Sequence, residues 1–116
     1  MKRPWQITNE EEWLRICEEV VVAAKGVLDR RLSVTEGARL LSSLRFRVRA
    51  GDDKDFLVFT GIASETDAFP MGEVRGQWSA EALARSDAKR EAVEAHWRHL
   101  AEVAAKNLIE RYEVAA

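Results

Sequence analysis

The acidic side chains near the middle of the chain are the first residues whose types and spacing suggest chemistry. They fall in two groups, Asp52, Asp53 and Asp55, followed by Glu65 and Asp67. Carboxylates on a loop held by rigid helices can steer a basic partner and bind its cationic groups. Hydrolysis by paired carboxylates needs one raised pKa and a cleft, and the sequence indicates neither. We therefore expect binding, and we assign no catalytic residue.

An arginine and a tryptophan follow the acidic residues, and both could shape the loop that carries them. We expect Arg75 to pair with Glu65 or Asp67, and Trp78 to anchor the loop in the core. In a purely structural interpretation, Ser64 or Asp67 caps a turn and the cluster does nothing more. In the functional interpretation, the candidate binding residues are Asp52, Asp53, Asp55, Glu65, Asp67, Arg75 and Trp78.

The sequence offers few residues that could bind a metal or a cofactor. His96 and His99 lie three residues apart on one helical face, with only Glu102 one turn further on, whereas a metal needs three or four ligands. No glycine-rich phosphate loop occurs. The single cysteine, Cys17, excludes an internal disulfide and lies on an apolar stripe, where we expect a buried, inert thiol. We predict no metal and no cofactor.

Composition bounds the class of protein. The chain has 116 residues, 47% of them hydrophobic and 33% charged, and its formal net charge is −2. One globular domain over residues 1–116 is the natural interpretation. Acidic and basic residues are interspersed, which gives no reason to expect nucleic acid. No apolar run is long enough to span a membrane. The lone cysteine and the absence of a secretion signal favour the cytoplasm.

The longest predicted element among those that position these residues is a single helix. Residues 79–111 contain no Gly or Pro, and Ser79 is a good N-cap, so we predict one long helix. At 1.5 Å per residue it would be about 50 Å long, so it either protrudes or breaks near Ser86-Asp87. Its C-terminal half carries an apolar stripe that we expect to face the core, made of Val93, Trp97, Leu100, Ala104, Leu108 and Arg111 or Tyr112.

Two further helices are predicted from capping patterns. The first starts near Thr8 or Asn9 and runs to about Asp29. The second starts at Ser33, which forms a capping box with Glu36, and the short connection makes the two an antiparallel hairpin. Gly37 lies on the face where the first helix could approach closely. Residues 44–49 alternate apolar and basic side chains, which leaves a strand as the alternative there.

Residues 53–62 favour a short helix, with Asp53 or Asp55 as its cap, although Phe56–Thr60 would also suit a buried strand. Residues 63–78 form the longest stretch without periodicity, broken by Pro70, Gly72 and Gly76. Loops of that length in compact domains are often functional. The predicted fold is all-α: an antiparallel helical bundle with one long C-terminal helix and an ordered loop before it.

A sequence resemblance supports a binding role. The run Ser64-Glu65-Thr66-Asp67 is followed by Pro70, Gly72, Arg75, Trp78 and Leu83, and it resembles a pattern in small uncharacterised bacterial proteins, as does the segment 36–39. The resemblance covers residues 30–110. These proteins are similar in size and helical character to immunity proteins, which neutralise antibacterial toxins. The resemblance implies a protein partner, such as a toxin domain, and carries over no catalytic residue.

Three functional hypotheses follow. The first is a non-catalytic, cytoplasmic protein-binding module, immunity-like, that blocks a partner through its acidic loop. The second is a homo-oligomeric structural protein, a homodimer in its simplest form, in which the long helix pairs with its copy. The third is a small hydrolase or metal enzyme that uses the loop acids or His96 and His99.

Overall fold

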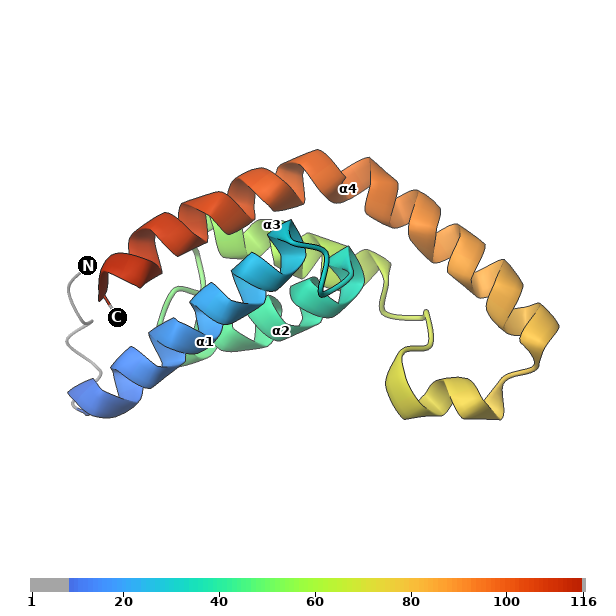
Figure 1. Cartoon of the computed structure of the whole chain (residues 1–116), viewed down its shortest axis with the longest axis horizontal. Coiled ribbons are helices and arrows are strands. Elements are labelled where there is room, and N and C mark those ends of the chain that lie inside the picture. Colours follow the sequence, from blue (N-terminus) through green and yellow to red (C-terminus); the bar gives the residue numbers. More distant parts are fainter. Residues whose placement is uncertain (1–8, 116) are drawn as a thin grey trace.

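The protein is all-α, as predicted, in a computed structural model that describes residues 9–115. Its elements are α1 (Glu10–Leu28), α2 (Val34–Arg47), α3 (Lys54–Glu65), a 3-10 helix η1 (Gly72–Gln77) and α4 (Ala80–Ala115). Figure 1 shows α1, α2 and α3 packed under α4, which arches over them and continues beyond them. The molecule is elongated, with extents of 49 × 27 × 23 Å.

The helix starts are fixed by side chains that bond to orphan backbone amides. Asn9 accepts a hydrogen bond from the Glu12 amide, and Ser33 forms the predicted reciprocal capping box with Glu36. Asp53 accepts from the amides of Asp55 and Phe56, which makes it the N-cap of α3. The helix is therefore the correct choice over the strand for this segment.

The α1–α2 hairpin is close-packed at one glycine. A Cβ atom on Gly37 would overlap the Cγ2 atom of Val27 on α1, so only Gly lets the helices approach this far. This confirms the expected close approach. The strand alternative for residues 44–49 is wrong, because α2 continues to Arg47 and Val48 buries its side chain as the C-cap.

The core lies where α1 packs against both α2 and the C-terminal half of α4. All four helices contribute side chains that are at most 2% exposed. Among the largest are Val20, Leu41, Phe56, Phe59, Ile62, Leu108 and Tyr112. Phe56 and Tyr112 meet edge to face at a ring-centroid distance of 5.9 Å. Cys17 is fully buried in this core, as expected.

The inward face of α4 differs in part from the predicted stripe. Ala104, Leu108 and Tyr112 are buried, and Val93 and Trp97 are half-buried, but Leu100 is 51% exposed. Its neighbour Ala101 takes the inward position instead. The prediction at Leu100 was wrong because it followed side-chain size, whereas this helix approaches α1 closely enough that alanines fill the contact.

α4 is unbroken, so the suggested break near Ser86-Asp87 does not occur. Ser86 is buried, and Asp87 pairs with Arg75 of the preceding loop. The first turns of α4 protrude beyond the helical body together with that loop (Figure 1). We call residues 66–90 the arm.

Candidate functional site

The first group of predicted binding residues is largely engaged in internal contacts. Arg111 on α4 forms two hydrogen bonds with the Asp53 carboxylate, at 2.5 and 3.0 Å. Asp55 is buried, accepts from the Asn107 amide at 3.1 Å and lies 3.4 Å from Arg111. These two carboxylates join α3 to α4, whereas Asp52 beside them is exposed.

The Asp53 carboxylate is held in its charged form. Burial acts to raise its pKa, but the hydrogen bonds from Arg111 and from the Phe56 and Asp55 amides outweigh burial and lower the pKa below its usual value. A general acid would need the opposite shift. Asp53 therefore serves as a structural anion at the start of α3.

The second group is split by the end of a helix. Ser64 and Glu65 belong to α3, not to the loop, and Glu65 accepts a hydrogen bond from the indole nitrogen of Trp97 at 2.6 Å. Asp67 lies in the loop and is exposed. The structure therefore does not bring the five acids together in one surface. Asp52, Glu65 and Asp67 are the members that remain exposed.

Arg75 and Trp78 shape the arm differently from the prediction. Arg75 binds both oxygens of Asp87 on α4, each at 2.8 Å, and the Pro70 carbonyl at 3.2 Å. The expected pairing with Glu65 or Asp67 was wrong, because η1 turns Arg75 toward α4. Trp78 is 40% exposed and does not anchor the loop in the core.

Arg39 on α2 provides the anchor that Trp78 does not. Its guanidinium donates to the Thr66 carbonyl at 2.7 Å and to the Phe69 carbonyl at 3.0 Å. Two carbonyls at the start of the loop are thereby tied to the helical body. The arm extends from the helical body, and most of its loop is exposed.

The nucleophile and metal candidates have no built site in the described residues. His96 and His99 are exposed, and His96 meets Trp97 edge to face. Between residues 9 and 115, no three His, Cys, Asp or Glu side chains converge as metal ligands would. Burial raises the pKa of the Cys17 thiol to about 11, which keeps it protonated and unreactive at neutral pH.

A groove lies between α1 and α2 on the described surface. Its volume is about 550 Å³, within the range of ordinary ligand pockets. The apolar side chains along it come from both helices and from their connection: Val22, Ala23, Leu32, Leu40 and Leu44. Val22 is 52% exposed and Leu40 is 47% exposed, so large apolar groups face solvent on both sides of the groove.

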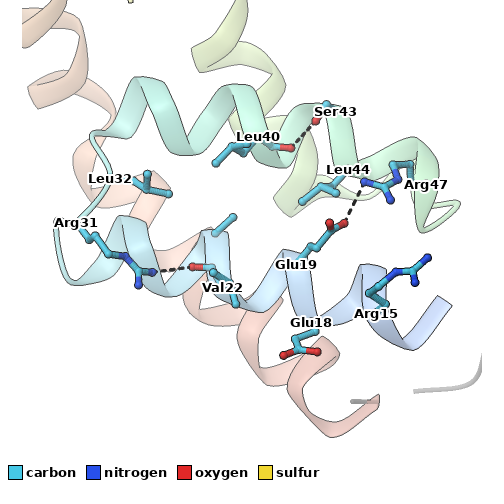
Figure 2. Close-up of a pocket in the computed structure, with 11 residues that line it drawn as sticks. Arg15, Glu18, Glu19, Val22, Arg31, Leu32, Leu40, Ser43, Leu44 and Arg47 are labelled. Carbon is cyan, nitrogen blue, oxygen red and sulfur yellow. Dashed lines mark hydrogen bonds and ion pairs between the residues drawn. The ribbon is translucent and has the colours of Figure 1, made fainter. Parts of the chain in front are cut away.

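Charged side chains surround this apolar strip. Glu19 on α1 and Arg47 on α2 pair across one end of the groove at 3.0 Å, with Arg15 and Glu18 nearby (Figure 2). Arg31 lies at the other end, beside the α1–α2 connection, and donates to the Val22 carbonyl at 3.2 Å. An apolar centre with a polar rim is the usual anatomy of a protein-binding patch.

One feature of the sequence indicates the groove, although the acidic cluster is more conspicuous. The run Val20-Val21-Val22-Ala23-Ala24 places apolar residues on more than one face of α1. A helix that covers its core with one stripe does not need Val22, and neither α2 nor α4 buries it. Leu40 likewise lies outside the buried apolar face of α2.

No helix within residues 9–115 combines the length and the apolar character that crossing a bilayer requires.

Comparison with known families gives one match: residues 4–108 match the model of a family described as "Protein of unknown function (DUF2489)". No curated protein and no solved structure matches the chain.

Proposed function

Because the chain belongs to the DUF2489 family, whose function is unknown, we propose its function from geometry: a non-catalytic module that binds a protein partner in the α1–α2 groove. The observation that carries the proposal is the exposure of Val22 and Leu40 on opposite sides of one groove. Contiguous apolar surface with a polar rim marks interaction sites in proteins that are otherwise well packed.

The groove suits a helix of the partner. Its walls are two antiparallel helices, and an amphipathic helix can place apolar side chains of one face between them. From Arg15 to Val22 the groove follows α1 for about 10 Å, which is roughly two helical turns. Such a site binds two or three apolar anchors of the incoming helix.

The experiment is site-specific crosslinking. A photoreactive phenylalanine replaces Leu40, or as a matched control Leu57, an equally exposed leucine on α3 that lies outside the groove. In extracts of the source cells we expect a discrete crosslinked protein from position 40 and none from position 57. Val22→Glu should abolish that crosslink while helicity by circular dichroism is unchanged. Equal crosslinking from both positions would contradict the proposal.

More specifically, we propose that the partner is a toxin domain. The resemblance to immunity proteins in size and helical character supports it, and the exposed carboxylates Asp52, Glu65 and Asp67 would attract a basic toxin surface. In this form, co-expression with a toxin encoded beside the gene restores growth. Val22→Glu abolishes the protection, and Glu65→Lys or Asp67→Lys weakens binding in a salt-dependent manner. The single buried cysteine favours a cytoplasmic location for such a module.

A homodimer is the second candidate, and one observation favours it. Leu100 and Val103 lie one turn apart on α4 and are 51% and 43% exposed, so the outer face of α4 offers apolar contact for a copy of itself. Light scattering across a concentration series tests this. A dimer that dissociates on Leu100→Glu but not on Leu40→Glu would support it, and a monomer at all concentrations would remove it.

A further inference from the structure

We propose that the partner helix carries an acidic side chain within one turn of the apolar residue that it seats between Val22 and Leu40, and that Arg31 binds this carboxylate. The inference rests on the proposed function of the groove and adds the chemistry and register of its occupant. It depends on where the Arg31 guanidinium lies and on what already binds it.

Arg31 is held in place at the connection end of the groove. Its backbone amide donates to the Asp29 carboxylate at 2.9 Å, and its Nη2 atom donates to the Val22 carbonyl at 3.2 Å. The guanidinium therefore reaches back along the groove to the level of Val22, as Figure 2 shows. An arginine whose position is already restrained loses less side-chain entropy when a ligand binds.

The guanidinium retains binding capacity. It has five N–H donors, and among residues 9–115 its side chain donates one hydrogen bond, to a backbone carbonyl. Within residues 9–115 no Asp or Glu oxygen lies within 4 Å of it. Glu19, an acidic residue of the groove on α1, is engaged by Arg47. A carboxylate is the group that a planar guanidinium binds best in two-point geometry.

The charges along the whole groove point the same way. Arg15, Arg31 and Arg47 stand against Glu18 and Glu19, which leaves one positive charge in excess. Since the Glu19–Arg47 pair lies at the opposite end, the excess is concentrated near Arg31. An acidic group on the occupant is therefore favoured at the connection end, next to the apolar contact at Val22.

The test uses two designed helical peptides of about fourteen residues. Both carry two leucines four residues apart, and a Glu four residues before the first leucine in one peptide is a Lys in the other. Chemical-shift titrations of the isotope-labelled protein report affinity and location together. We expect wild-type protein to prefer the Glu peptide by about two- to fivefold, the range of an exposed ion pair. The shifts should centre on Val22 and Leu40.

Two charge variants make the test specific. Arg31→Glu should reverse the preference toward the Lys peptide, whereas Arg30→Glu, the exposed neighbour outside the groove, should leave it unchanged. If both peptides bind the groove and Arg31→Glu changes neither, the inference fails and the proposed function stands. If neither peptide shifts the groove resonances, the proposed function fails as well. Concentration-dependent shifts at Val22 without peptide would identify a second copy as the occupant and overturn both.

Discussion

The carboxylate of Glu94 on α4 accepts two hydrogen bonds from Thr35 on α2, from the backbone amide at 3.0 Å and from the hydroxyl at 2.6 Å. Thr35 is the second residue of α2, so its amide is one of the orphan donors at that helix end. Glu94 thus caps α2 from another helix, far away in sequence. Arg90, one turn before it, lies 3.8 Å from the same carboxylate.

Glu94→Ala is predicted to reduce the free energy of unfolding by about 1–3 kcal/mol, because it leaves the buried Thr35 amide without an acceptor. Glu94→Gln keeps an acceptor oxygen and should cost less. Urea denaturation measures both. Equal losses in the two variants would mean that charge, not capping, is the stabilising factor.

Gly37→Ala is predicted to destabilise the protein by about 1–3 kcal/mol, since the added methyl overlaps Val27. Combining it with Val27→Ala should cost less than the sum of the single changes, because the second change makes room for the first. Thermal unfolding of the four proteins gives the coupling. Gly76→Ala, where a Cβ meets nothing within 4 Å, is the control and should be close to neutral.

Asp53 gives stability a defined pH dependence. Its pKa is lowered in the folded state, so its contribution is complete above the unfolded pKa of about 4 and is lost as pH falls through the lower folded value. Asp53→Asn keeps a good N-cap but removes the ion pair with Arg111. We expect a loss of about 1–2 kcal/mol at pH 7 and a flatter stability curve between about pH 5 and pH 3. Asp52→Asn should keep the wild-type curve.

The contact between η1 and α4 depends on the two-point ion pair of Arg75 with Asp87. The hydrogen bonds from Arg75 lower the pKa of Asp87 and keep its carboxylate charged. Asp87→Asn removes the charge that holds Arg75, so the η1 segment should lose contact with α4. We predict faster amide exchange in residues 72–77 with little change in global stability, because the core lies elsewhere. Glu73→Gln is the matched exposed control. Unchanged exchange in the Asp87 variant would show that other contacts order the arm.

The parts of this fold that could be predicted depend on residues close together in the sequence. Asn9, Ser33 and Asp53 cap their helices by bonding to amides two or three positions away. Such caps can be recognised without knowing which elements pack together. The inward face of α4 depends on which helix it meets, and Leu100 was misplaced for that reason.

The candidate site was less predictable for the same reason. The acidic residues were conspicuous by their type, but Arg111 and Asn107, which lie 58 and 52 residues further along the chain, bind Asp53 and Asp55. The groove arises from Val22 and Leu40, which belong to different helices and are ordinary in composition. What makes them notable is that both stay about half exposed beside one groove, and only tertiary structure reveals that.

The pairing of the first helix with the last has a consequence for biosynthesis. Figure 1 shows α1 alongside the C-terminal half of α4, so the surface that buries Cys17 and Val20 is complete only after α4 has been made. Before α4 is made, a hairpin of α1 and α2 would leave the apolar side that α4 covers in the complete fold exposed to solvent. A chain truncated before Leu108 lacks part of this core, so we expect such a fragment to aggregate in place of folding as a smaller protein.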